Sequence, residues 1–438
     1  MYPAPRALYR VAPSSAAAVI DPADQPSETA AAERLTPRER EAVAFVQTLG
    51  NALHRFGAPA NRLEDVMQVL SAELGLRGSF FSTPTAIFYA FDLPEHRQFA
   101  RLVRVHGHEL DLAKMAELDR LFNDVLAGRV ELAEGTRRVD EIVDRAPTWS
   151  PAVIVLAFAL TSGAAAAFFG GTLRETALGA VCGLVLALTF AFTRRWTDLG
   201  RLFEPLGALL VTLTAVALSQ AFGASAWVAT LAGLIALVPG FSLTIGATEL
   251  ALNHPASGVA RIAAGLTTLL MLTMGVLLGQ QLGTDVLGFT PLDEPVGLRP
   301  VGLETVSLIV AGLSIGVLFR TAARDLVWSV VAVVLPYAAF EAGIAEFGRE
   351  ASIFVGGLIA GSFANLFGRF FDRPSMIVRL PGILILVPGA TGLLSLESIA
   401  GGDQQAGIEM FFRVAMTATA LVAGFFAANV VVPPRKAL

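Results

Sequence analysis

The sequence predicts a polytopic α-helical membrane protein of about ten spans, arranged as two inverted five-span repeats, with an N-terminal soluble α+β domain. Three observations predict this class. Of the 438 residues 54% are hydrophobic and only 16% are charged, with a mean hydropathy of +0.62, whereas soluble domains carry roughly 25% charged residues. The charges gather before Trp149, and apolar runs of membrane-spanning length follow it. A short motif recurs within the apolar part.

The chain begins with a segment that is expected to lack structure. Residues 1–32 are rich in Pro, Ala and Ser and are interpreted as a disordered tail. Pro13, Ser14 and Ser15 interrupt the apolar stretch that a secretory signal would need. The formal net charge of −5 argues against nucleic acid as a partner. Cys182 is the only cysteine, so no intrachain disulfide can form, and its apolar surroundings favour a packing role.

Residues 33–147, called the N-domain below, are predicted to form a small α+β domain of about 110 residues, enough for a core of its own. Thr36, Pro37 and Glu39 form a helix start with a capping box, and Gly57 ends that helix. The expected elements after it are a helix over 62–74 with Asn61 as its N-cap, strands over 78–83, 85–92 and 98–105, and helices over 111–127 and 131–145.

The N-domain offers little for catalysis. His54, His106 and His108 raise the hypothesis of a metal site, but no cysteine accompanies them and a His-x-His pair on a strand edge is a weak signal. The acidic pairs of its helices are typical of solvated faces and caps. We therefore expect no metal, no cofactor and no enzymatic activity, and a structural or regulatory role for this domain.

The apolar part is divided into two expected repeats, 151–282 and 302–432. The predicted spans are 151–169, 176–193, 203–222, 226–246, 260–282, 302–319, 326–345, 351–368, 377–397 and 408–432.

Loop charge predicts the orientation. Loops on the side of the N-domain hold most of the basic residues, namely Arg194, Arg195, Arg201, Arg261, Arg320, Arg324, Arg369, Arg373, Arg379, Arg435 and Lys436. The opposite loops hold Arg174, Arg299 and Arg349, together with Asp285, Asp293, Glu294 and Asp403. By the positive-inside rule the N-domain and the C-terminus face the cytoplasm, in a multi-pass protein of the cell membrane.

An internal repeat is the most informative pattern. Leu237-Val238-Pro239-Gly240 recurs as Leu386-Val387-Pro388-Gly389, and weaker matches follow in the same order, among them Leu173-Arg174-Glu175 with Ala323-Arg324-Asp325. Five spans per repeat would insert the second half upside down, which is typical of secondary transporters. A duplication retained only for packing is the alternative.

The Pro-Gly pairs are the candidate substrate site. Pro239-Gly240 and Pro388-Gly389 break a helix inside a span, and a helix that restarts there presents free N–H groups and a positive dipole end to a carboxylate. Hydroxyl residues follow each break, with a glutamate beyond them that could bind an ammonium group or carry a proton. The candidate residues are Pro239, Gly240, Ser242, Thr244, Thr248, Glu249, Pro388, Gly389, Thr391, Ser395 and Glu397. Packing is the alternative role for the hydroxyls, and a position at the water interface is the alternative for the glutamates.

Other polar residues lie in apolar spans. Glu409 and Arg413, four residues apart, suggest a structural ion pair, and Glu341 is a further intramembrane carboxylate. Asn365 and Asn429 could line a path or join helices by hydrogen bonding.

One motif carries a family resemblance. Gly57-Ala58-Pro59-Ala60-Asn61-Arg62-Leu63-Glu64 resembles the N-domain motif of the threonine/serine exporter family of bacteria and fungi, in particular at Gly57, Ala58, Pro59, Arg62 and Glu64. The resemblance extends from about Ala42 over nearly the whole chain, including Pro84-Thr85 and the five-plus-five apolar region. It implies export of threonine and serine, coupled to the proton gradient as antiport.

The sequence thus favours a secondary active transporter that exports small hydroxylated amino acids, with the proton as coupling ion and the lipid bilayer as its surroundings. Its oligomeric state stays open. One rival is a transporter or channel for another small polar or anionic solute. The other is a membrane-anchored hydrolase acting through the N-domain, although neither a Gly-x-Ser-x-Gly sequence nor a convincing triad supports it.

Overall fold

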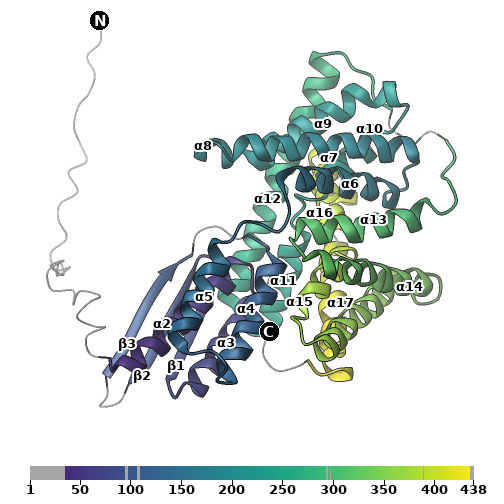
Figure 1. Cartoon of the computed structure of the whole chain (residues 1–438). Helices are drawn as coiled ribbons and strands as arrows, with labels where there is room; N and C mark the ends of the chain where they lie inside the picture. Colours follow the sequence, from purple (N-terminus) through teal and green to yellow (C-terminus); the bar gives the residue numbers. More distant parts are fainter. Residues whose placement is uncertain are drawn as a thin grey trace, which may run out of the picture.

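The computed structural model describes residues 35–93, 97–105, 109–292, 294–295, 297–387 and 389–434. The expected tail, His106, His108 and Pro388 lie outside these ranges. In Figure 1 the N-domain lies beside one end of a larger body of helices.

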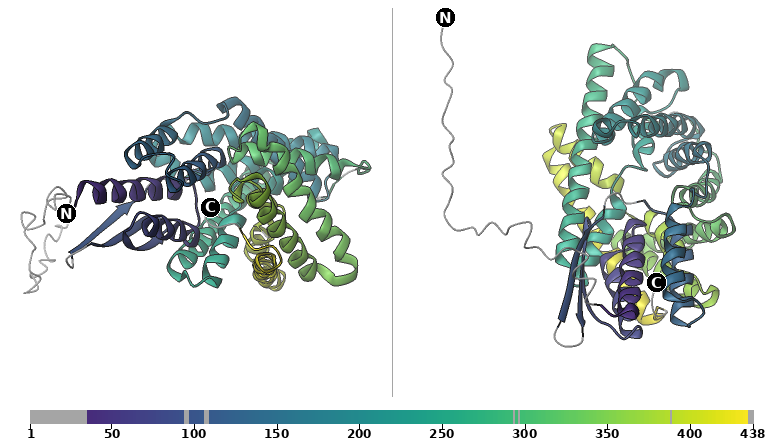
Figure 2. Two further views of the ribbon diagram at one scale, coloured as in Figure 1. Left: turned by 60° about the horizontal axis from the view of Figure 1, so that its bottom comes forward. Right: turned by 60° about the vertical axis from the view of Figure 1, so that its left-hand side comes forward.

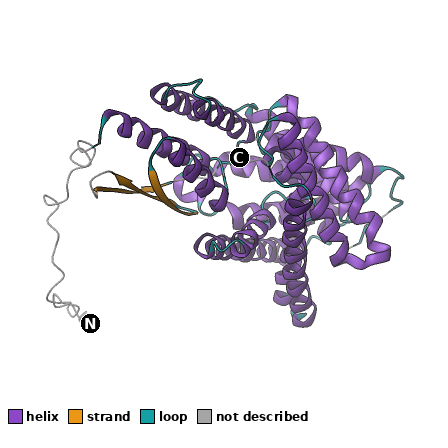
Figure 3. Cartoon of the chain, turned by 90° about the horizontal axis from the view of Figure 1, so that it is seen from below, coloured by secondary structure: helices purple, strands orange, loops and turns teal. Residues whose placement is uncertain are grey.

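The N-domain consists of helices laid over one face of a small sheet (Figure 3). Its elements are α2 (Pro37–Arg55), α3 (Ala60–Glu73), β1 (Arg77–Thr83), β2 (Ala86–Leu93), β3 (Arg97–Arg104), α4 (Leu112–Leu126) and α5 (Leu132–Asp144). The strands are antiparallel in the order β1-β2-β3, with Phe80 paired with Tyr89 and Tyr89 with Arg101. Ile87, Tyr89 and Phe91 alternate along β2 and are buried under the helices. The predicted order of elements is confirmed.

The structure confirms the predicted start of the first helix and contradicts the predicted start of the second. The Thr36–Glu39 capping box is present in both directions, as predicted. The prediction of Asn61 as the second cap is wrong: α3 begins at Ala60, and its N-cap is Pro59, which offers no side-chain hydrogen bond. Ala60 instead donates its backbone N–H to Glu249, a residue of the apolar part. A partner distant in the sequence therefore replaces the local cap.

The first half of the apolar part continues the chain through helices joined by short turns. Its elements are α6 (Pro151–Phe168), α7 (Leu173–Thr193), α8 (Thr197–Gly200), α9 (Phe203–Phe222), α10 (Ala226–Leu234), α11 (Gly240–Ala251), α12 (Pro255–Gln281) and the π-helical turn η1 (Leu282–Val286). The second half contains α13 (Leu303–Leu318), the 3₁₀ turn η2 (Ala323–Asp325), α14 (Leu326–Phe371), α15 (Met376–Leu384), α16 (Gly389–Ala400) and α17 (Gln404–Val431).

Within the described residues seven helical stretches are long and apolar enough to cross a membrane. Three features separate this number from the ten predicted spans. The fourth expected span is divided into the short helices α10 and α11. The sixth, α13, has only 16 residues. The seventh and eighth are joined in α14, where Gly348 with φ 76° interrupts the helical backbone. Breaks and a tight turn, which hydropathy alone does not resolve, account for the difference.

Each half has a buried acid at the start of one helix that binds the segment before a later, short helix. Glu175, at the start of α7, accepts a hydrogen bond of 2.9 Å from the backbone N–H of Ser225, just before α10. Asp325, which precedes α14, pairs with Arg373, just before α15. Both acids are buried, and the sequence comparison aligned them with one another. The first helices of the halves also meet, since Thr161 of α6 donates to Ser314 of α13 at 2.8 Å.

The N-domain is joined to the apolar helices end to end. The first N–H groups of α4 donate to the two carbonyls that directly follow α13, Leu112 to Phe319 at 3.0 Å and Ala113 to Arg320 at 3.2 Å. The Arg320 guanidinium contacts Glu109 at 2.7 Å. Each helix end thereby satisfies backbone groups that the other leaves free. Met376 and Leu380 of α15 belong to the same hydrophobic core as the N-domain helices, so the two parts share buried surface.

Candidate functional site

Two broken helices meet in the middle of the apolar part. The chain leaves the helical path at 235–239 between α10 and α11, and again at 385–387 between α15 and α16. A Cβ atom added to Gly240 would lie 3.1 Å from Cα of Gly389, and one added to Gly389 would lie 3.3 Å from Cα of Gly240. Val238 and Val387 flank this approach, each against the glycine of the other break. Only a residue without a side chain permits so close a contact of two backbones.

The helix that restarts at Gly240 has free backbone donors. Its N-cap is Pro239, which supplies no side-chain acceptor. The N–H groups of Gly240, Phe241 and Ser242 have no acceptor among the described residues, and the first bond of the new helix runs from Leu243 to Pro239. These donors and the positive end of the helix dipole make the start of α11 a favourable place for an anion.

The candidate hydroxyls divide into two groups. Thr244 donates to the carbonyl of Gly240, Thr248 to that of Thr244, and Ser395 to that of Gly407. Ser242 and Thr391, each two positions after its glycine, are partly exposed and have no hydrogen-bond partner among the described residues. The second pair is therefore available to a ligand, whereas the first group stabilises the helices.

Glu249 is held by several donors at the boundary with the N-domain. Its side chain is fully buried, and both oxygens already accept hydrogen bonds. Arg261 of α12 donates Nε to both oxygens at 3.0–3.1 Å. Ser257 donates its hydroxyl at 2.8 Å, and Ala60 of α3 its backbone N–H at 3.0 Å. The arrangement makes Glu249 a joint between the N-domain and the apolar helices.

Glu397 has a simpler environment at the other end of α12. It is partly exposed and accepts one hydrogen bond of 3.1 Å, from Gln280. Ser257 and Gln280 are separated by roughly 35 Å along α12, given a rise of about 1.5 Å per residue. Figure 2 (right) shows this helix, with the N-domain beside one of its ends. The sequence also predicts that 238–249 and 387–397 face each other near the midplane and line the substrate path, and this stays a prediction. The breaks meet, but α11 and α16 leave the meeting point toward opposite ends of α12.

The N-domain motif forms the turn that reaches Glu249. Gly57 adopts φ 91°, a conformation that side chains other than glycine rarely take. Ala58 is buried, and Pro59 precedes the first helical residue. Glu64, one turn later, accepts the N–H of Ser82 at 2.7 Å and lies 3.5 Å from the ring of His254. Burial raises the pKa of Glu64, and the bond from Ser82 opposes that rise.

Several other polar residues of the sequence analysis have structural partners. His54 contacts the carbonyl oxygen of Thr83 at 2.7 Å, and no cluster of metal ligands occurs among the described residues. Asn365 of α14 donates to Asn429 of α17 at 2.9 Å, so this pair joins helices. Glu409 and Arg413 form the expected ion pair, on an exposed face.

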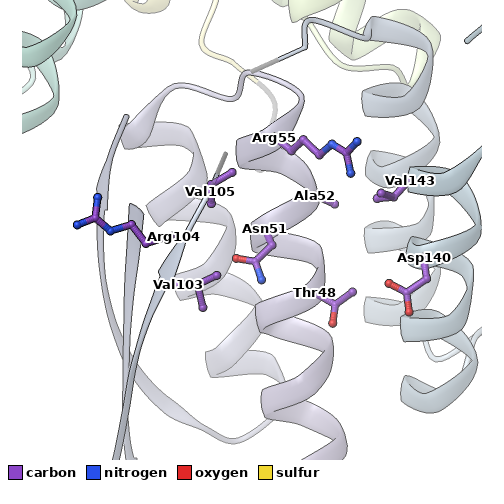
Figure 4. Close-up of a pocket in the computed structure, with 9 residues that line it drawn as sticks. All are labelled: Thr48, Asn51, Ala52, Arg55, Val103, Arg104, Val105, Asp140 and Val143. Atoms are coloured by element: carbon purple, nitrogen blue, oxygen red, sulfur yellow. The ribbon is translucent and has the colours of Figure 1, made fainter. Parts of the chain in front are cut away.

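A separate groove of about 500 Å³ lies in the N-domain between α2, β3 and α5 (Figure 4). Its described lining includes Thr48, Asn51, Arg55 and Asp140, together with apolar and basic side chains.

Comparison with known proteins agrees with this architecture. Residues 44–283 match the family model described as "Putative threonine/serine exporter", and residues 304–431 match a second one described as "Threonine/Serine exporter, ThrE". The chain belongs to the threonine/serine exporter family. The gap between the two matches coincides with the boundary between the two halves, and the resemblance of the N-domain motif is confirmed as a family relationship.

Several fungal proteins are similar to this exporter-family chain. Pheromone-regulated membrane protein 10 of Debaryomyces hansenii is 25% identical over 83% of this chain and 37% of the relative, and that of Kluyveromyces lactis is 26% identical over 83% and 39%. An uncharacterized protein of Schizosaccharomyces pombe is 22% identical over 90% of this chain and 51% of the relative. The chain thus spans about half or less of these relatives. No solved structure matches it.

Some residues of this family member were not anticipated as part of the site. Arg261 and Ser257 hold Glu249, Gln280 holds Glu397, and Arg379 donates to Asn365. Arg261 and Arg379 had been counted only as loop charges. Their spacing in the sequence gives no sign of these partners, because each partner comes from a different helix.

Proposed function

We propose that this membrane protein is a secondary transporter that exports threonine, serine or similar small amino acids from the cytoplasm, and that the N-domain faces the cytoplasm. Family membership and the apolar helices support transport across a membrane. The observation that carries the proposal is the meeting of the two breaks. Beside it lie N–H groups and the hydroxyls of Ser242 and Thr391, which have no hydrogen-bond partner among the described residues. An amino acid brings a carboxylate that needs donors and a side-chain hydroxyl that needs a partner.

Proton coupling is assigned in this proposal to Glu397 rather than Glu249. A carboxylate that takes up and releases a proton must not be fixed by a cation. Both oxygens of Glu249 are occupied by Arg261, Ser257 and Ala60, whereas Glu397 forms no ion pair among the described residues and accepts one hydrogen bond from a neutral amide. Intramembrane carboxylates of this kind are typical of proton relays.

The proposal also takes the halves as inverted repeats that exchange inward and outward arrangements. Three observations support this. The breaks approach each other reciprocally, and α11 and α16 leave them in opposite senses along α12. Glu175 and Asp325 each bind the segment before a short helix, Glu175 through a backbone N–H and Asp325 through an arginine. A structure in which the halves superpose without reversal of the membrane normal would contradict it.

The test is transport into inside-out vesicles with an imposed pH gradient, first screened across amino acids and then applied to Glu397→Gln. We expect threonine or serine to be taken up in the wild type and proton-driven uptake to fall at least tenfold in Glu397→Gln, while exchange of substrate without a gradient is retained. Glu409→Gln, on an exposed face, is the matched control. Unchanged gradient-driven uptake in Glu397→Gln would rule out its role, and uptake of no amino acid by the wild type would rule out the proposed function.

A further inference from the structure

Each half contains a helical hairpin that begins at its break. α11 turns into α12 in the first half and α16 into α17 in the second, and each turn contains one residue of positive φ. A Cβ atom added to Gly258 of α12 would lie 2.8 Å from the carbonyl oxygen of Gly246. One added to Gly407 of α17 would lie 2.7 Å from the carbonyl oxygen of Ser395, which lies equally far beyond its break. Only glycine allows so close an approach, so the two helices of each hairpin are in backbone contact and are expected to move together.

The first hairpin extends from the breaks to the N-domain (Figure 1). It begins at Gly240, and α11 has only 12 residues before the turn. Near the turn, Glu249 accepts the N–H of Ala60 at 3.0 Å, and Nδ1 of His254 lies 3.5 Å from Oε2 of Glu64. These two contacts, called the clamp below, both involve the N-domain motif. The turn of the second hairpin is exposed instead.

Glu64 is the acid with which His254 can pair. The charged residues of α11, α12 and the first two turns of α3 are Arg62, Glu64, Asp65, Glu249 and Arg261. Arg261 donates to both oxygens of Glu249, so the charge of Glu249 is balanced. The remaining pair on α3 lies three positions apart and carries opposite charges. Glu64 pairs with no lysine or arginine among the described residues, and β1 supplies only the backbone N–H of Ser82. Histidine gains its charge as the pH falls from about 8 to 5, and the charged form attracts a carboxylate.

We propose that the α11–α12 hairpin is the gate of the breaks on the N-domain side, that the clamp holds this gate closed, and that protonation of His254 tightens the clamp. The inference rests on the proposed function. A solute passes the breaks only after Gly240 and Gly389 separate, because their backbones are in contact. Since α11 is short and packs along α12, this separation displaces the hairpin turn and must open both contacts of the clamp.

A fall in pH on the N-domain side tightens the clamp. Protonated His254 attracts ionised Glu64 only while the hairpin turn lies against α3, that is, in the docked form. Burial raises the pKa of Glu64, and the bond from Ser82 opposes that rise. A raised pKa means that the docked form takes up the proton more readily than an exposed glutamate does, so Glu64 also favours the docked form as the pH falls. Export therefore slows when the N-domain side becomes acidic.

Threonine exchange without a gradient measures the strength of the clamp. The full-length protein is placed in phosphatidylcholine vesicles with equal pH on both sides, and exchange of labelled for unlabelled threonine is followed between pH 6 and 8. We expect wild-type exchange to slow about 2- to 5-fold from pH 8 to pH 6, the range typical of a partly exposed ion pair. His254→Gln and Glu64→Gln should lose most of this dependence and exchange faster than the wild type at pH 6. Asp65→Asn, which removes an exposed acid of the same turn, is the matched control and should keep the dependence.

A reversible cross-link tests whether the clamp must open. In Glu64→Cys/His254→Cys, a two-carbon bis-methanethiosulfonate reagent can bridge the two positions, and reductant removes the bridge. The native Cys182 is fully buried, and the single variant Glu64→Cys controls for labelling without a bridge. We expect the linked protein to lose threonine exchange at least tenfold and the reductant to restore it.

Three outcomes would overturn the inference. Full exchange by the linked protein would rule out the gate, and the same pH dependence in the wild type and His254→Gln would rule out the role of protonation. Slower exchange in His254→Gln at every pH would mean that the contact supports transport, which contradicts a clamp. In each case the wild type still exchanges threonine, so the proposed function stands. A wild type that exchanges neither threonine nor serine refutes the proposed function itself.

Discussion

Replacement of Glu249 by alanine tests whether this carboxylate joins the N-domain to the apolar helices. The substitution leaves the N–H of Ala60 without its acceptor and Arg261 without its ion-pair partner, in a place where Glu249 is fully buried. A hydrogen bond to a charged group contributes about 1.5–3 kcal/mol. Since about 1.4 kcal/mol corresponds to a factor of ten, the first turn of α3 should open about 10- to 150-fold more often.

Hydrogen exchange measures this opening directly. The amide of Ala60 should exchange faster by that factor in Glu249→Ala, and faster to a smaller extent in Glu249→Gln, which keeps an oxygen acceptor but loses the charge. Amides in the middle of α2 should be unaffected. Glu397→Ala is the matched control, because Glu397 lies at the far end of α12 and should leave Ala60 unchanged. Unchanged exchange at Ala60 in Glu249→Ala would refute the joint.

Two further predictions concern other long-range contacts. A Cβ on Gly389 would lie 2.6 Å from a methyl group of Val238, so Gly389→Ala should lower the free energy of unfolding by about 1–3 kcal/mol, seen as a lower unfolding temperature in detergent. Val238→Ala in the same chain should recover most of the loss, and no recovery would contradict the proximity of the two breaks. The hydrogen bond from Arg320 lowers the pKa of Glu109, with partial burial opposing it. The ionised Glu109 therefore stabilises the folded state above its unfolded pKa of about 4.3, and this contribution is lost as pH falls through the lowered folded pKa. The stability difference between wild type and Arg320→Ala, measured by thermal unfolding between pH 3 and 7, should become smaller as the pH falls. A difference independent of pH would argue against the ion pair of Arg320 and Glu109.

The sequence by itself determined the features that depend on neighbouring residues. The Thr36–Glu39 capping box, the strands with their alternating burial, and the apolar runs after Trp149 all follow from local chemistry and hydropathy. The two Pro-Gly breaks could also be predicted from the sequence, because proline removes a backbone donor wherever it stands. The motif at Gly57 was sufficient to indicate the family that the comparisons then established.

Only the tertiary structure decided which groups face each other. Hydropathy could not show that α10 and α11 are separate short helices, or that Gly348 interrupts α14 without a loop. Ala60 donates a hydrogen bond to Glu249, a residue far away in the sequence, and this contact replaces the expected Asn61 cap. Glu249 and Glu397 occupy equivalent places in the sequence repeat, yet one is bound by an arginine and the other by a neutral amide. The physical reason is that a side chain's chemistry is set by the groups that folding brings within hydrogen-bond distance, and those groups come from helices whose packing is not encoded in local sequence spacing.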